Sequence, residues 1–246
     1  MTEVYFKNPR HRPLGTDGAT SSNVIFLGRK AITSGVINLY GCTSIVVFND
    51  ICLWISHSFE NPSFISGDEV FDRDVLQALR KGEYGKKRVT DTDPANWHNV
   101  GLIDLVEPQC LIGKDQKAFI ITPRPRTSNP DAAPSGTLMY GDRVAQIKDL
   151  LRELTPNATI HISDYAPRWP DKIYETSQGQ FFDNLYGKVI FKYDPIKCFK
   201  SDPAGGGGMV PIAGMQLSVE DNIIYEGEWR NHYHQLVLEE GDLGQE

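Results

Sequence analysis

The stretch Leu39–Phe64, LYGCTSIVVFNDICLWISHSFENPSF, decides the fold of this chain. It holds two short runs of β-forming residues, TSIVVF and ICLWI, which are separated only by Asn49 and Asp50. A two-residue pair of this kind closes a tight hairpin. If these two residues form the loop, Cys42 lies directly opposite His57, with the two Cβ atoms about 4.5–5.5 Å apart.

The same register distributes the side chains of the hairpin over two faces. One face carries Ser44, Val46, Phe48, Leu53, Ile55 and the Cys42–His57 pair, and the other carries Thr43, Ile45, Val47, Cys52, Trp54 and Ser56. Both faces are largely apolar, so we expect the hairpin to lie inside a sheet that is covered on both sides. A three-residue loop or a bulge would instead shift the register by one residue and separate Cys42 from His57.

Outside the hairpin, strands alternate with two amphipathic helices. Apolar residues at helical spacing predict helices over Gly67–Gly82 and Tyr140–Pro156. The predicted strands are Asn23–Arg29, Lys117–Pro123, Ala158–Tyr165, Tyr186–Pro195 and a hairpin over Met215–Trp229 that turns near residues 220–222. This pattern predicts an α/β fold, a mixed β-sheet core or sandwich with a central antiparallel hairpin, covered by amphipathic helices.

The predicted organisation is one α/β domain over residues 23–235. An irregular arm rich in Pro, Gly, Thr, Ser and basic residues precedes it at residues 1–22, and a frayed tail follows at residues 236–246. The segment Val36–Tyr40 leads into the central hairpin. The loop Pro123–Gly136 contains four prolines and reads as a plain surface loop, with a mobile flap beside a site as the alternative.

Composition restricts the classes of partner. The net charge of −7 over 246 residues argues against a nucleic-acid-binding protein, which is usually basic. No apolar stretch reaches the ~20 residues of a membrane span. No signal peptide is visible and the four cysteines have no CxxC spacing, which predicts a cytoplasmic chain with reduced thiols. A mature secreted form whose leader has been removed is the alternative.

Cys42 and His57 are the candidate catalytic residues. A protonated histidine beside a cysteine lowers the pKa of the thiol, so the pair predicts a thiolate and an imidazolium. Gly41 allows a tight turn or a positive φ immediately before the thiol, where the backbone N–H groups of Gly41 and Thr43 could form an oxyanion hole. The alternatives are a buried structural cysteine, a core histidine and a simple kink at Gly41.

A metal site is a weaker candidate. His232 and His234 lie on the same side of an extended segment, and Glu226, Glu228 or Asp221 could complete a zinc site with them. No third ligand has a diagnostic spacing, so we interpret these residues as exposed side chains near the C-terminus. We therefore predict neither a metal nor an organic cofactor.

The residues LYGCT, with a histidine fifteen places after the cysteine, resemble the catalytic core of bacterial protein-glutamine deamidases. These include toxins of the cytotoxic necrotising factor type, the Burkholderia lethal factor and, more distantly, the chemotaxis receptor deamidases. The resemblance covers about residues 36–64, and Tyr40 stands where that family has a serine. The longer pattern GCTxxxVF…W…SHxxENPSF also resembles a group of fungal proteins. That resemblance includes the strand ending in Thr122–Arg124, extends to about residue 195 and implies no particular activity.

The deamidase resemblance implies that Cys42 attacks the side-chain amide of a glutamine, with His57 as its base, through a thioester intermediate. It also implies that a main-chain carbonyl orients the histidine. Val36 is the nearest match for that carbonyl, and Thr33 and Asn38 are weaker ones. The implied partner is a protein substrate that presents a glutamine side chain. The alternatives are a catalytically inactive protein-binding module of the same fold, or a transglutaminase-like or cysteine-peptidase-like enzyme.

Overall fold

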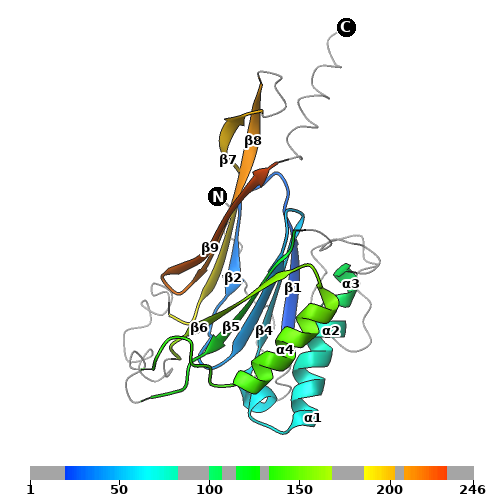
Figure 1. Ribbon diagram of the computed structural model, residues 1–246, viewed down its shortest axis with the longest axis vertical. Coiled ribbons are helices and arrows are strands. Elements are labelled where there is room, and N and C mark those ends of the chain that lie inside the picture. Colours follow the sequence, from blue (N-terminus) through cyan, green and yellow to red (C-terminus); the bar gives the residue numbers. More distant parts are fainter. Residues whose placement is uncertain are drawn as a thin grey trace.

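Two β-sheets form the centre of the protein in a computed structural model that describes residues 20–82, 100–106, 115–127, 133–167, 186–202 and 208–231 (Figure 1). The five-stranded sheet has the order β1 (Ser21–Phe26), β4 (Cys52–Ser58), β3 (Thr43–Phe48), β5 (Lys117–Pro123) and β6 (Thr159–Tyr165). The four-stranded sheet has the order β2 (Ile32–Val36), β7 (Val189–Ser201), β8 (Met209–Val219) and β9 (Asn222–Arg230). Among these described strands only β5 and β6 pair in parallel. The fold is therefore mixed α/β and dominated by sheets, as predicted.

Both predicted helices are confirmed. One continuous helical segment consists of α1 (Asp68–Phe71), a π-helical stretch (Asp72–Gln77) and α2 (Ala78–Lys81). The second is α4 (Gly141–Leu154), which connects β5 to the parallel strand β6, and α3 (Ile103–Val106) is a single short turn. None of the helices in the described ranges is long and apolar enough to cross a membrane.

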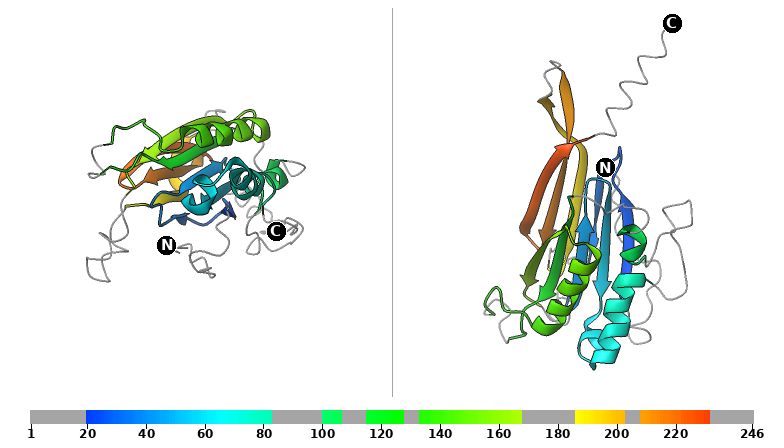
Figure 2. Two further views of the ribbon diagram at one scale, coloured as in Figure 1. Left: turned by 90° about the horizontal axis from the view of Figure 1, so that it is seen from below. Right: turned by 45° about the vertical axis from the view of Figure 1, so that its right-hand side comes forward.

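The five-stranded sheet is covered on both faces, by helices on one side and by the four-stranded sheet on the other (Figure 2). The helix-side core contains Ile45, Val47, Cys52 and Trp54 together with Phe71, Val75, Leu79, Val144, Ile147, Leu150 and Leu151 of the helices. The sheet-side core contains Val46, Phe48, Leu53 and Ile55 together with Val189, Phe191, Ala213, Met215 and Leu217. This confirms both the two-sided burial of the central hairpin and the distribution of its residues over the two faces.

The predicted register of the central hairpin is wrong by two residues. Phe48 pairs with Leu53, and Ser44, not Cys42, lies opposite His57. The side chain of Asn49 accepts hydrogen bonds from the backbone N–H groups of Ile51 and Cys52, both at 2.9 Å. Asn49 therefore flanks the turn instead of forming it. Because the pairing moved by two positions in total, every side chain stayed on its predicted face.

The C-terminal hairpin is confirmed and is longer than predicted. It turns at Glu220 and Asp221, between β8 and β9. β7 does not stop at Pro195 but continues to Ser201, with a register irregularity between Asp194 and Cys198. Pairing with β2 reaches only Tyr193, so Pro195 lies where β7 needs a partner on one side alone. The far end of the β7–β8 hairpin projects beyond the rest of the sheet (Figures 1 and 2).

Several sequence predictions fall outside the described residues. These are residues 1–19 of the N-terminal arm, the tail at residues 236–246, and the two histidines His232 and His234. β1 begins at Ser21, within the predicted arm.

Candidate active site

One edge of the five-stranded sheet gathers the residues that the sequence singled out. β3 runs antiparallel to β4 and β5, and β6 runs parallel to β5, so the start of β3 meets the ends of the other three strands. Cys42 immediately precedes β3, and His57 is the penultimate residue of β4. Topology therefore places both candidate catalytic residues at the same edge.

Cys42 and His57 share a face but are not directly opposed. The residue opposite His57 is Ser44, and Cys42 lies two positions before it. Such a diagonal neighbour in an antiparallel pair is separated by roughly 7–8 Å. Cys42 is partly buried and packs against the sheet-side core. The register thus places the two residues on the same face of the sheet, as diagonal neighbours.

The electrostatics of the pair differ from the expected thiolate and imidazolium. Burial raises the pKa of the Cys42 thiol to about 11, although a backbone hydrogen bond from Glu60 acts in the opposite direction. Burial alone lowers the pKa of His57 to about 4. Removal from water disfavours the charged form of each group, and neither charge compensates the other. At neutral pH the structure therefore favours a neutral thiol and a neutral imidazole.

His57 has an incompletely satisfied imidazole. Its ring stacks on Phe59, with centroids 4.7 Å apart and planes inclined by 29°. Its Nε2 atom is buried and has no hydrogen-bond partner among the described residues. Buried polar atoms of folded proteins are nearly always hydrogen-bonded, so this nitrogen needs an explanation. A neutral imidazole with a vacant nitrogen has the capacity to accept a proton.

The backbone before Cys42 is held in an unusual conformation. Gly41 has φ 139°, in the region that favours glycine. Its N–H donates to the hydroxyl of Tyr165 at 2.9 Å, and that hydroxyl donates to the carbonyl of Cys42 at 2.7 Å. The Gly41 N–H, a predicted oxyanion donor, is therefore already engaged. Thr43, the other predicted donor, begins β3, and its hydroxyl lies 3.1 Å from that of Thr122.

Val36 occupies the last position of β2, opposite Val189. Its side chain belongs to the sheet-side core. β2 packs against β4, the strand that carries His57. The strand of the predicted orienting carbonyl, β2, therefore packs against the strand of the histidine, β4, although the two belong to different sheets.

An ion pair between Glu60 and Arg126 lies against the backbone before Cys42. Arg126 Nη2 also donates to the carbonyl of Tyr40 at 3.1 Å, and the hydroxyl of Tyr140 donates to Glu60. A Cβ atom on Gly41 would collide with the ends of both charged side chains, and the positive φ also favours glycine there. Sequence reasoning did not identify this network. Its only signal was the position of Glu60 in the ENPSF motif and of Arg126 just after the TPR motif.

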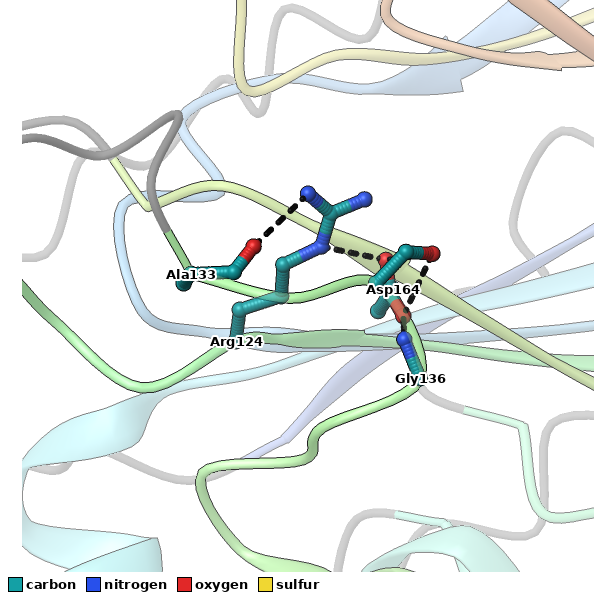
Figure 3. Close-up of polar contacts among 5 residues, drawn as sticks. Arg124, Ala133, Gly136 and Asp164 are labelled. Carbon is teal, nitrogen blue, oxygen red and sulfur yellow. Dashed lines mark hydrogen bonds and ion pairs between the residues drawn. The ribbon is translucent and has the colours of Figure 1, made fainter.

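A second ion pair joins Arg124, just after β5, to Asp164 near the end of β6. Arg124 Nε is 2.6 Å from Asp164 Oδ1, and its guanidinium also donates to the carbonyl of Ala133 at 3.4 Å (Figure 3). The backbone N–H of Gly136 donates to Asp164 as well. These contacts attach both ends of the Pro123–Gly136 loop to β6. Residues 128–132 lie outside the described part of the chain, so the flap interpretation stays a prediction.

The acidic residues considered for a metal site have other partners. Glu228 forms ion pairs with Lys197 at 2.9 Å and with Lys200 at 2.6 Å, and Glu226 accepts a hydrogen bond from Gln216 at 3.0 Å. Within the described ranges, no group of three or more His, Cys, Asp and Glu side chains is arranged to hold a metal ion.

No model of a known protein family matches the chain, and the search of curated proteins finds no match either.

Proposed function

We propose that this protein is a cysteine-dependent amidohydrolase that deamidates glutamine side chains of a protein substrate. The observation that carries the proposal is the vacant Nε2 of His57, one diagonal step from the partly exposed Cys42 at the same sheet edge. A thiol and an unengaged base in this arrangement form the minimum apparatus of nucleophilic catalysis.

Because both groups favour their neutral forms, the proton must leave the thiol as the sulfur attacks. His57 accepts it, a carbon–sulfur bond forms with the amide carbon, and the carbonyl oxygen becomes an oxyanion. Ammonia leaves with the proton held by His57. Water then hydrolyses the thioester, which yields glutamate and regenerates the thiol. In this proposal the carbonyl of Val36 orients the imidazole, and the reaction uses no cofactor.

The oxyanion requires N–H donors near Cys42. The N–H of Gly41 serves only if Tyr165 releases it, whereas the N–H of Thr43 at the start of β3 is the second candidate. The backbone of Glu60 already donates a hydrogen bond toward the sulfur. This donor stabilises negative charge that develops at the site.

The test is ammonia release from a mixture of glutamine-containing peptides, with conversion of glutamine to glutamate read by mass spectrometry. We expect Cys42→Ser and His57→Ala to abolish release while retaining the wild-type circular dichroism spectrum. Cys198→Ser is the matched control, because Cys198 is another partly buried free thiol, located on β7. Release by Cys42→Ser would contradict the proposal. Incorporation of an added amine would indicate a transglutaminase, and cleavage of the peptide backbone a peptidase.

One observation favours a second candidate function, a catalytically inactive protein-binding module. The raised pKa of Cys42 leaves very little thiolate at neutral pH, as expected for a structural thiol. Alkylation of Cys42 by iodoacetamide, followed against pH in wild type and in His57→Ala, separates the two candidates. A Cys42 that reacts only after unfolding would favour the binding module. A reactive thiol that slows in His57→Ala would favour the enzyme.

A further inference from the structure

The Glu60–Arg126 pair differs from an ordinary surface ion pair because both of its members contact the backbone next to Cys42. Only small fractions of the two side chains are exposed, 14% for Glu60 and 25% for Arg126. Arg126 holds the carbonyl of Tyr40, and the two charged groups together leave no room for a Cβ on Gly41. The residues immediately before the thiol therefore lie against a pair of opposite charges.

Both oxygens of the Glu60 carboxylate are engaged. Oε2 accepts from Arg126 and Oε1 accepts from the hydroxyl of Tyr140 at the start of α4. The backbone of Glu60 in turn donates toward the sulfur of Cys42. Glu60 thus contacts three places at once: the thiol of Cys42, Arg126 just after β5, and Tyr140 at the start of α4.

We propose that Glu60 and Arg126 are positioning residues for Cys42: the pair fixes the backbone before the thiol, and the balance of its two charges sets the reactivity of the sulfur. The inference rests on the proposed function in taking Cys42 as the nucleophile. Glu60 disfavours negative charge on the sulfur and Arg126 favours it. A substrate that draws Glu60 away, or binds to it, would therefore leave Arg126 to stabilise the developing thiolate.

The two members must have opposite effects, which gives the proposal a sharp test. We would measure the pH dependence of Cys42 alkylation by mass spectrometry in the full chain, with iodoacetamide and with the smaller reagent methyl methanethiosulfonate. Glu60→Gln removes the negative charge and should accelerate alkylation about three- to tenfold at a fixed pH below the thiol pKa. Arg126→Gln leaves Glu60 unbalanced and should slow it by a similar factor.

The second ion pair provides the matched control. Arg124 also follows β5, its partner Asp164 lies near the end of the neighbouring strand β6, and the two are similarly buried, with 22% and 8% of their side chains exposed. Their contacts go to the Pro123–Gly136 loop instead of to Cys42 (Figure 3). Asp164→Asn should therefore leave the pH profile of Cys42 alkylation unchanged, while thermal unfolding shows how much each ion pair contributes to stability.

A purely structural role predicts a different pattern. If the pair only keeps the edge of the sheet closed, both Glu60→Gln and Arg126→Gln accelerate alkylation, and that result would overturn the proposal. A thiol that reacts with neither reagent in any of these folded proteins would also overturn it. Because the readout is thiol chemistry, opposite shifts without ammonia release would refute the deamidase function alone. Ammonia release without opposite shifts would refute the role of the pair alone.

Discussion

The two faces of the five-stranded sheet are both buried, but particular polar side chains on them differ in their hydrogen bonding. On the helix side, the indole N–H of Trp54 donates to the carbonyl of Val100 at 2.8 Å, and the hydroxyl of Ser22 donates to the same oxygen at 2.9 Å. On the sheet side, Nε2 of His57 is buried without a partner among the described residues. Ser34 of β2, which shares a face with the core residue Val36, likewise has an unpartnered hydroxyl.

This difference in hydrogen bonding has a cost in folding free energy. An unpartnered buried polar group costs about 1–3 kcal/mol, which a purely structural core has no reason to retain. On the helix side, Trp54 and Ser22 follow that rule. The sheet side departs from it at His57 and Ser34, and His57 is one of the two residues on which the proposed function depends.

The largest expected effect tests the packing role of the helix side. Trp54 is completely buried, so Trp54→Ala removes a large side chain and leaves the carbonyl of Val100 with one donor fewer. We expect the free energy of unfolding in urea to fall by about 3–5 kcal/mol. A loss of less than about 1 kcal/mol would contradict a close-packed helix-side core.

The second effect tests the buried imidazole of the sheet side. The folded-state pKa of His57, about 4, lies below the ordinary value of 6.5, so the unfolded chain binds more protons between these pH values. Stability is fully present above pH 6.5 and falls as the pH drops toward 4, by about 2–3 kcal/mol for this group. Denaturant unfolding across this range measures the loss.

The control for this titration is His57→Phe, which keeps an aromatic ring beside Phe59 but carries no titrating group. We expect it to lack this part of the pH dependence. Identical profiles for wild type and His57→Phe would show that His57 does not titrate as a buried group.

The smallest effect compares two tyrosines of the sheet-side core. Tyr165 and Tyr193 are equally buried, and each donates its hydroxyl to a backbone carbonyl, of Cys42 at 2.7 Å and of Gly28 at 2.8 Å. Each change to Phe should cost about 1–2 kcal/mol. Only Tyr165→Phe should alter the alkylation rate of Cys42, because it alone releases the backbone beside the thiol. An equal change in the Cys42 alkylation rate of both variants would show that Tyr165 has no specific role beside the thiol.

The strands and helices of this protein were predictable because they depend on local patterns. The α4 stripe of Val144, Ile147, Leu150 and Leu151 is buried as the 3.6-residue period requires. The alternation of the central hairpin likewise assigned each side chain to the correct face, even though its register was wrong. Face assignment survives an error of two positions, since the side-chain period of a strand is two.

The candidate site was predictable only in part, for reasons that are visible in particular residues. The single side chain of Asn49 moved Cys42 from a directly opposed position to a diagonal one. The charge state of the pair depends on burial by distant segments, which raises the pKa of one group and lowers that of the other. Neither effect has a signature in sequence spacing.

The sequence by itself determined the periodicity of the apolar residues, and this periodicity determined the strands and helices. It also determined that both faces of the central hairpin are covered and that Cys42 and His57 lie on the same face. Only the tertiary structure decided what surrounds the thiol. Glu60 and Arg126 are 66 positions apart and Glu60 and Tyr140 are 80 apart, yet both partners contact Glu60 because the fold brings these parts of the chain together. Electrostatic interactions depend on distance in space, whereas a sequence pattern records only distance along the chain.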